Sequence, residues 1–395
     1  MYCFRIKRLL AIAVTLLSLL TGCSLPQVTA EQRIFLNLSL DYLGEYQLPK
    51  MKYKDTPVGG LSALAYDRAR DRFYVLSDDR SQLAPARFYT FKLALNETGI
   101  QNAEIENVTF LKTEDNQTYP KAKLDPEGIA LTPQQTVFIS SEGVTKEGIP
   151  PFLREFDLQT GQQKSSLPIP ERYIAATTDD KEEKGIQDNL GFEALTLNPT
   201  GTVPAKGEPI RLFTATESAL IQDLDPPAKD EQGNPKPQIN KCRLLHYYIG
   251  DGPPVLIAEH VYPLAPTPEG ALAHGLTELL ALDQAGHFLS LERSFLGLAG
   301  VQAKVYQIAT GGATDTSRVV SLKGELSGIQ PVKKKLLFDL SEIGIPLDNL
   351  EAMALGPRLP VGSQSLILLS DDNFQEQQVT QFLLFKLKTE RQSAT

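Results

Sequence analysis

One sequence unit recurs five times along the chain, and this repetition constrains the fold more than any other feature does. Each unit opens with a short apolar segment: 62–66, 127–131, 193–197, 278–282 and 351–355. After a turn comes a second apolar segment that ends on an acid: Asp78, Glu142, Glu217, Glu292 and Asp371. A third segment has a basic or polar residue at its first or second position: 87–93, 153–158, 243–249, 304–308 and 381–387. Five matches in the same order predict one supersecondary unit repeated five times.

The turns inside the units have the composition of β-hairpins. Asp67–Asp71, Asn198–Gly201 and Asp283–Gly286 join the first segment to the second with Asp, Asn, Pro and Gly. Short apolar segments bounded by such turns, without helical periodicity, predict an all-β protein. Radial repetition of small sheets protects their exposed edges. The sequence therefore predicts a single β-propeller with five recognised repeats.

The ends of the chain are expected to close this ring. Phe35–Leu48 precedes the first unit, so we expect it to pair with the C-terminal segment Val379–Leu387. Val301–Leu340 contains enough strand-like sequence for one more blade, so the sequence allows either five or six blades. Four segments are candidate fourth strands: Ile105–Leu111, Ser166–Ile169, Val255–Val261 and Leu336–Leu340.

The N-terminal residues have the pattern of a secretory signal. Three basic residues among the first eight precede Leu9–Leu20, an uncharged run of twelve residues that is short for a transmembrane helix. The run ends in Leu-Thr-Gly-Cys23, which resembles the lipobox of bacterial lipoproteins. We expect a signal peptide over 1–22, a lipidated Cys23, a tether over 23–33 and the propeller domain over 34–395. The protein would then be exported and anchored to a membrane of the cell envelope. The alternative is an ordinary cleaved signal with an incidental cysteine.

Charge and cysteine content narrow the function further. Removing the signal segment, with its three basic and no acidic residues, would change the formal net charge from −9 to −12. An acidic chain without a basic patch is not expected to bind nucleic acid. Only Cys23 and Cys242 would remain, so lipidation of Cys23 would exclude an internal disulfide. Stability must then come from a large hydrophobic core.

No familiar catalytic motif is present in the sequence. The four histidines, His246, His260, His274 and His287, lack the spacing of a metal pair. We interpret them as structural residues, although His274 lies close to the start of a first segment. Two insertions, Thr177–Asn189 and Gln222–Lys241, have the composition of solvated loops.

Acidic residues recur at equivalent positions of the repeat. Glu127, Glu193, Glu278 and Glu351 open four first segments, whereas Ser62 opens the other. Equivalent positions in a propeller lie on a ring around one axis, so these carboxylates are expected to face a shared channel. At about 4 Å two carboxylates repel by roughly 4 kcal/mol at an effective dielectric of 20. Such a ring needs protons, basic partners or a hard cation, of which Ca²⁺ tolerates the most varied oxygen geometry.

Units one and five add a second acid each. These two units are neighbours across the expected ring closure, so Asp78-Asp79 and Asp371-Asp372 are expected to converge. The candidate metal ligands are therefore Asp78, Asp79, Asp371, Asp372, Glu127, Glu193, Glu278 and Glu351. The alternative is a structural series of salt bridges between these acids and the basic residues near the third segments, Arg87, Arg154, Arg243 and Lys304.

Five dispersed motifs resemble the phytase-like family, which is described as having an esterase-like activity of phytase. They are Gly59-Gly-Leu-Ser62, Asp125-Pro-Glu-Gly128, Gly191-Phe-Glu-Ala194, Leu350-Glu-Ala352 and Ser370-Asp-Asp372. The resemblance covers about residues 55–390. It implies a propeller related to the alkaline, Ca²⁺-dependent β-propeller phytases, which hold phosphate over clustered calcium ions. The dense Asp-rich motifs of those phytases are not recognisable in this sequence.

Two functions follow as hypotheses. The first is a Ca²⁺-assisted hydrolase of phosphoric or other esters, displayed at the envelope and acting on a small molecule. The second is a non-catalytic binding or scaffolding propeller whose acids are structural. Three or more acids converging without basic partners would favour the first, and one-to-one pairing of acids with arginines would favour the second.

Overall fold

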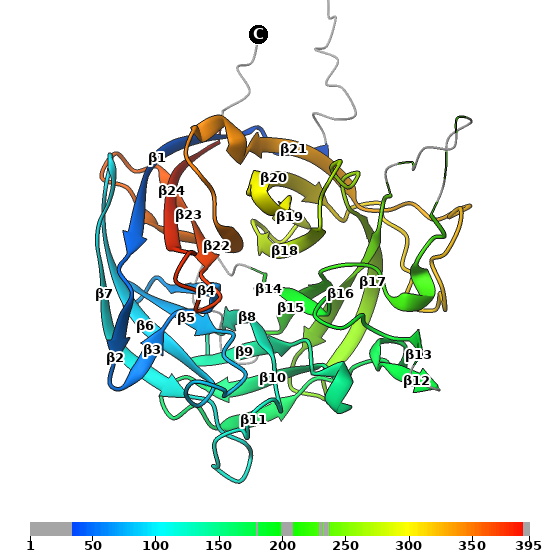
Figure 1. The fold of residues 1–395 in the computed structure, drawn as a ribbon, viewed down its shortest axis with the longest axis horizontal. Helices are drawn as coiled ribbons and strands as arrows, with labels where there is room; N and C mark the ends of the chain where they lie inside the picture. The colour runs from blue at the N-terminus through cyan, green and yellow to red at the C-terminus, as the bar shows by residue number, and fades with distance from the viewer. Residues whose placement is uncertain are drawn as a thin grey trace, which may run out of the picture.

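Twenty strands form five four-stranded antiparallel sheets arranged around a central axis (Figure 1). This computed structural model describes residues 34–178, 181–198, 208–227, 229, 232, 236 and 238–389. The expected signal peptide, Cys23 and the tether lie outside these residues. The prediction of an all-β propeller is confirmed, and the described residues contain no helix long and apolar enough to span a membrane.

The five sheets, or blades, follow one another along the chain, and each runs outward from its first strand. Blade 1 contains β4 (Leu61–Asp67), β5 (Arg72–Ser77), β6 (Arg87–Asn96) and β7 (Gly99–Phe110). Blade 2 contains β8 (Pro126–Leu131), β9 (Thr136–Ser141), β10 (Phe152–Asp157) and β11 (Gln163–Ser166). Blade 3 contains β14 (Phe192–Leu197), β15 (Ile210–Thr216), β16 (Lys241–Ile249) and β17 (Val255–Pro263). Blade 4 contains β18 (Ala273–Ala281), β19 (His287–Phe295), β20 (Val301–Ala309) and β21 (Lys333–Asp339).

Blade 5 closes the ring with both ends of the described chain. It contains β22 (Asn349–Arg358), β23 (Gln364–Asp371), β24 (Thr380–Thr389) and, outermost, β1 (Leu38–Leu48). β1 pairs antiparallel with β24 from Leu38 opposite Thr389 to Leu48 opposite Thr380, and the two lie side by side in Figure 1. The expected closure is confirmed. Val301–Leu340 supplies β20 and β21 of blade 4, so the blade count is five.

Short elements decorate the loops between the blades. Two small hairpins pair β2 (Met51–Tyr53) with β3 (Thr56–Val58) and β12 (Ala176–Thr178) with β13 (Lys181–Lys184). Five 3₁₀ turns lie in the described loops: η1 (Thr145–Glu147), η2 (Glu171–Tyr173), η3 (Ile221–Asp223), η4 (Gly297–Ala299) and η5 (Leu340–Ile343).

The hydrophobic core lies between the faces of neighbouring blades. Phe73 and Phe91 of blade 1 pack in one cluster with Phe382 of blade 5, and the rings of Phe91 and Phe382 have centroids 6.1 Å apart. Aromatic side chains of this size contribute most of the apolar area that a blade interface buries. The core therefore fixes each blade against the next and holds the first strands around the axis.

Every first strand carries a β-bulge near its start. In blade 1 Leu61 pairs with Ser77 and Ala63 pairs with Leu76, so Ser62 is left out of the pairing. Blade 5 skips Glu351 in the same way, and the irregularities in blades 2 and 3 include Glu127 and Glu193. A bulge re-aims the extra residue relative to the sheet. The bulged residues therefore form the ring position that the repeat predicted.

Blade 4 corrects the predicted ring. Leu276 pairs with Glu292 and Glu278 pairs with Leu291, so the bulged residue is Thr277 rather than Glu278. The residue equivalent to Asp78, Glu142, Glu217 and Asp371 is by the same register Arg293, not Glu292. A shift of one residue moves every side chain to the opposite face of a strand. Blade 4 therefore brings a hydroxyl and a guanidinium, instead of two carboxylates, to the ring.

Candidate functional site

A pocket of about 1240 Å³ opens at the end of the axis where the second strands finish. Its charged lining comes from all five blades and the loops that follow their strands. The charged residues include Asp78, Asp79, Arg80, Asp125, Glu127, Glu193, Glu217, Arg293, Glu351 and Asp371. The pocket is thus predominantly acidic, as the repeat positions predicted.

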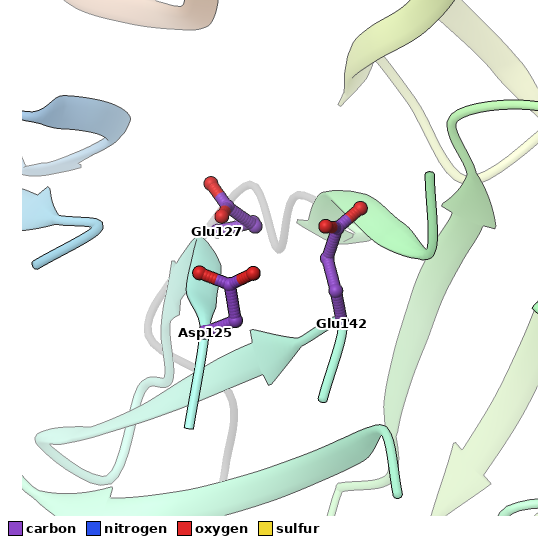
Figure 2. Close-up of side chains that lie close together, drawn as sticks. All are labelled: Asp125, Glu127 and Glu142. Atoms are coloured by element: carbon purple, nitrogen blue, oxygen red, sulfur yellow. The ribbon is translucent and has the colours of Figure 1, made fainter. Parts of the chain in front are cut away.

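Two groups of three carboxylates converge beside this pocket. The oxygens of Asp125, Glu127 and Glu142 lie within 4.8 Å of one another, and so do those of Glu142, Glu193 and Glu217. Figure 2 shows the first group, with Asp125 and Glu127 at the start of β8 and Glu142 just after β9, all turned toward a common space. Glu142 belongs to both groups, and these groups could hold a metal ion.

Glu142 has one carboxylate oxygen that is buried without a hydrogen-bond partner among the described residues. Its side chain is buried, with 1% of the residue exposed. Its Oε1 accepts a hydrogen bond from the Gly191 amide, but its Oε2 has no hydrogen-bond partner among the described residues. Burial raises the pKa of Glu142 well above its usual value, and the charges of Asp125 and Glu217 raise it further. Leaving a buried acceptor unpaired costs about 1–3 kcal/mol, and more for a charged group, so a proton or a cation at this oxygen would stabilise the folded protein.

The two carboxylates next to Glu142 are also unpaired. Neither Glu127 nor Glu193 forms an ion pair with a basic residue in the described part of the chain. Burial raises both pKa values well above the usual range, with repulsion by Glu193 next for Glu127 and by Glu142 next for Glu193. Three adjacent acids without basic partners do not fit a one-to-one series of salt bridges.

Arg80 pairs with the outer acid of the first group. Its Nε donates to Asp125 Oδ1 at 2.6 Å, and its Nη2 lies 2.5 Å from Asp125 Oδ2. Burial raises the pKa of Asp125 to about 6, and the charge of Arg80 opposes that rise. Arg80 also donates to Asn189, so it joins the loop after β5 to the loop before β14.

Arg293 pairs with acids of both neighbouring blades. Its Nη2 donates to Glu217 Oε1 of blade 3 at 3.1 Å, and its Nη1 donates to Glu351 Oε1 of blade 5 at 3.1 Å. Nη1 also contacts the Asn349 side-chain oxygen, whereas the buried Nε has no partner among the residues described. Arg293 thus supplies a fixed positive charge to the part of the ring opposite blades 1 and 2.

The carboxyls of blades 1 and 5 form a third acidic group. Asn349 Nδ2 donates to Glu351 Oε1 at 2.8 Å and reaches Asp371 Oδ2 at 3.5 Å. Burial, followed by the charge of Asp371, raises the pKa of Glu351 to about 8, and burial raises that of Asp371 to about 7. Burial and Asp371 raise the pKa of Asp78 well above its usual value. Without a cation, Glu351 and Asp371 therefore exchange protons near neutral pH.

Three of the eight predicted ligands have their carboxylates occupied elsewhere. Asp79 accepts the amides of Gln82, Leu83 and Ala84 and the Arg87 guanidinium, and Asp372 accepts those of Gly60 and Phe374 and pairs with Lys50. Glu278 accepts the amides of Leu195 and Leu279. Metal binding by these three stays a prediction that the geometry does not favour. The five others, Asp78, Asp371, Glu127, Glu193 and Glu351, line the pocket.

The motif Gly59-Gly-Leu-Ser62 requires glycine at position 60, because the backbone there turns close to Asp78. Gly60 has φ +58°, and a Cβ there would stand 2.1 Å from Asp78 Oδ1. Its carbonyl accepts the Asp78 amide at 2.7 Å, and its own amide donates to Asp372 Oδ1 at 2.9 Å. Only glycine tolerates this approach and conformation without strain. The motif therefore brings blades 1 and 5 together at the pocket.

Of the four basic residues proposed as partners of the acids, Arg87 pairs with Asp79 as that alternative expected, and the other three bind elsewhere. Arg243 pairs with Asp223 and Glu259, and Lys304 pairs with Asp339. Arg154 donates to the Tyr119 hydroxyl. His274 bonds Ser294 Oγ and the Ala265 carbonyl, as expected of a structural histidine. Sequence reasoning did not include Glu142, Glu217, Asp125, Arg80 or Arg293 among the site residues. Glu142 and Glu217 stand at a repeat position that it recognised, and Asp125 stands within one of the quoted motifs.

Comparisons with known proteins name a family. No curated protein sequence matches the chain significantly. Two solved structures are similar over most of the chain at 10% identity. The catalytic domain of a GH62 alpha-L-arabinofuranosidase from Coprinopsis cinerea has a TM-score of 0.38 and covers 89% of this chain and 97% of its own. The N-terminal domain of Nup159 has a TM-score of 0.30 and covers 90% and 96%. Scores this low support no functional inference.

The family assignment rests on a sequence model. The model of the phytase-like family, described as the esterase-like activity of phytase, matches residues 56–374. The match spans most of the chain and contains every acid and arginine of the pocket described above. The chain therefore belongs to the phytase-like family.

Proposed function

We propose that the protein is a metal-assisted ester hydrolase that holds Ca²⁺ at Glu142 and acts on phosphoric or other esters. The observation that carries the proposal is the buried Oε2 of Glu142, which has no hydrogen-bond partner among the described residues and lies next to Glu127 and Glu193, two acids without a basic partner there. Membership of a family described by an esterase-like activity supports a hydrolase. The pairs of Asp79, Asp125, Glu217 and Glu351 with arginines are what a scaffold with structural acids requires. They leave Glu127, Glu142 and Glu193 without a basic partner among the described residues, which that second hypothesis does not explain.

Calcium is the cation that the donor set fits best. All the candidate ligands near Glu142 are carboxylate oxygens, and neither group contains a histidine or a cysteine. Zinc prefers nitrogen and sulfur ligands, and Mg²⁺ demands regular octahedral geometry. Ca²⁺ accepts six to eight oxygens at irregular angles. Glu127, Glu142 and Glu193 would hold it, with Asp125 or Glu217 completing the site.

The residues around the cation have separate tasks in this proposal. Bound there, Ca²⁺ would neutralise charge on an ester oxygen and lower the pKa of a coordinated water. Arg80, whose side chain is 32% exposed, is the accessible cationic group at the mouth and would orient an anionic ester. Arg293 holds Glu217 and Glu351 in place from blade 4.

A turnover assay with and without calcium tests this proposal. Full-length protein is incubated with p-nitrophenyl phosphate, bis-p-nitrophenyl phosphate and p-nitrophenyl acetate in calcium or in chelator. At least one ester should be hydrolysed in calcium only, and Glu142→Gln should lower the rate about 100-fold or more. Glu104→Gln, an exposed acid on β7, is the matched control and should keep the wild-type rate. A rate of hydrolysis that changes neither when calcium is removed nor in the Glu142→Gln variant would contradict the proposal.

We further propose that the protein acts at the cell envelope through a lipid on Cys23. The support is the basic, apolar and Leu-Thr-Gly-Cys pattern of residues 1–23. Lipidation with more than one chain anchors a protein stably, whereas one chain binds only marginally. Cys23→Ser should abolish labelling with a radioactive fatty acid and lower the processed, membrane-bound fraction. Unchanged labelling and fractionation would reject the anchor without touching the hydrolase proposal.

A further inference from the structure

An apolar patch adjoins the acidic pocket on blade 4. It consists of Leu272, Phe295 and Leu298, called the apolar rim below. Leu298 is fully exposed, Leu272 is 74% exposed and Phe295 is 42% exposed. Single exposed apolar residues need no explanation, but a group of them at the edge of a polar pocket is typical of a binding surface.

Leu272 lies beside Phe295 and beside Gly297, the residue that precedes Leu298. The Leu272 amide donates to the Phe295 carbonyl at 2.7 Å, and Leu272 Cδ1 lies 3.2 Å from the position of a Cβ on Gly297. The turn that carries Leu298 is closed, because the Leu296 amide donates to the Gly300 carbonyl at 2.8 Å. Leu298 therefore stands on a structured turn, η4, that keeps it in solvent.

The apolar rim reaches the pocket through Phe295, whereas Leu272 and Leu298 lie outside the residues that line it. Phe295, Gly297 and Val301 line the same pocket as Arg293 and the carboxylates. Leu83, 59% exposed, lines it from the corresponding loop of blade 1, between the second and third strands. Blades 1 and 4 are not neighbours in the ring, so apolar side chains flank the mouth on two sides. A molecule that reaches the acids from solvent passes between these surfaces.

We propose that the rim binds the apolar arm of the substrate, so that the substrate class is an ester carrying an alkyl, acyl or aryl group. This inference rests on the proposed function, because the ester head must lie at the Glu142 cation for its arm to reach blade 4. Continuity with the pocket favours an arm of the same molecule over a separate partner. The opposed position of Leu83 favours a chain between two sides over a flat surface.

The inference predicts affinity that grows with chain length. Each methylene moved from water to apolar surface tightens binding by up to about fourfold. A chain that lies on a partly open rim gains only part of this, so octylphosphonate should bind at least about tenfold tighter than methylphosphonate. Phosphonates carry the charge of a phosphoric ester but cannot be hydrolysed at the carbon–phosphorus bond.

Calorimetry with methyl-, butyl- and octylphosphonate in calcium tests the inference. The full-length protein is held in phosphatidylcholine nanodiscs, which avoids detergent. Leu272→Ser with Leu298→Ser should remove most of the preference for octylphosphonate and change methylphosphonate binding by less than about twofold. The control is Val320→Ser with Val361→Ser, two exposed valines that do not line the pocket, and it should keep the preference.

The outcomes separate this inference from the hydrolase proposal. If affinity increases from methyl- to octylphosphonate but no ester is hydrolysed, the result supports binding at the rim and contradicts the proposed function. Hydrolysis of acetyl and octanoyl esters with equal KM, or equal or undetectable binding of the three phosphonates, would overturn the rim. Close contact of Leu272 and Leu298 with spin-labelled lipid headgroups, together with equal phosphonate binding, would assign the rim to a lipid surface and also overturn it.

Discussion

Blades 2 and 4 share one repeat but bring opposite charges to the axis. Blade 2 places Glu127 and Glu142 at the two ring positions, and neither has a basic partner in the described chain. Blade 4 places Thr277 and Arg293 at the same positions, and Arg293 pairs with acids of both neighbours. The repeat therefore forms the ring of side chains around the axis. The arginine that replaces an acid in blade 4 determines which acids of the ring are left without a basic partner and can bind a cation. The cation site is expected where blade 4 does not reach.

Removing the arginine of blade 4 should have the largest effect on stability. Arg293→Met keeps much of the volume but leaves Glu217 and Glu351 buried without their partner, which typically costs about 3–5 kcal/mol. Denaturant unfolding measures the change. Arg72→Met, which breaks a partly exposed pair with Glu106, should cost at most about 1 kcal/mol. Equal small losses in both variants would show that Arg293 does not neutralise the ring.

Adding calcium should have the next largest effect, and it should act through blade 2. A ligand that binds only the folded state at a hundredfold excess over its Kd stabilises it by about 2.7 kcal/mol. Glu142→Gln should abolish the rise in melting temperature, as should Glu127→Gln with Glu193→Gln. The sequence-based candidate pair at the ring closure, Asp78→Asn with Asp371→Asn, should weaken the rise less. A wild-type melting temperature that calcium does not change would contradict a cation at blade 2.

Stability without calcium should fall as the pH rises. The raised pKa values of Asp371, about 7, and Glu351, about 8, mean that the folded chain binds more protons than the unfolded one. The contribution of these two carboxyls to stability is therefore full only below about pH 4 and is lost as the pH rises to about 8, by at most about 1.4 kcal/mol per pH unit for each group. Urea unfolding in chelator between pH 5 and 8 measures this slope. A stability that increases with pH over this range would contradict the burial of protonated acids.

The smallest effect is expected at the residue that the repeat misplaced. Burial raises the pKa of Glu278 well above its usual value, and its oxygens accept backbone amides. Glu278→Gln should therefore change stability by less than about 1 kcal/mol and leave the calcium response intact. Loss of the calcium response in this variant would show that Glu278 belongs to the cation site, which the observed pairing of β18 with β19 does not allow.

The comparison also shows where sequence reasoning succeeded. The repeat and its turns predicted the five blades and their closure by β1 and β24, because strand pairing follows local patterns of apolar residues and turns. The ring positions in blades 1, 2, 3 and 5 followed, since the bulge recurs at the same place. The alignment of blade 4 was wrong by one residue. Glu278-Leu-Leu-Ala-Leu282 has the same residue pattern as the other first segments, but it begins one position after the bulged residue, Thr277.

Side-chain reach was harder to predict than strand order. Arg80 spans from the end of blade 1 to Asp125 before blade 2, and Arg293 reaches two blades at once. Neither contact has a fixed spacing in sequence, because both depend on how the blades pack. The unpaired Oε2 of Glu142 depends on the same packing, although the residue itself stood at a recognised repeat position.

The most direct test of the account is a crystal structure of the full-length protein grown with calcium, with anomalous scattering used to locate the ion. The account predicts a peak about 2.3–2.6 Å from Glu142 Oε2, with Glu127 or Glu193 oxygens in the same coordination shell. It also predicts that the peak disappears in Glu142→Gln crystals grown identically. A structure at saturating calcium in which Glu142 Oε2 bonds only water or a neighbouring carboxyl would contradict the central claim.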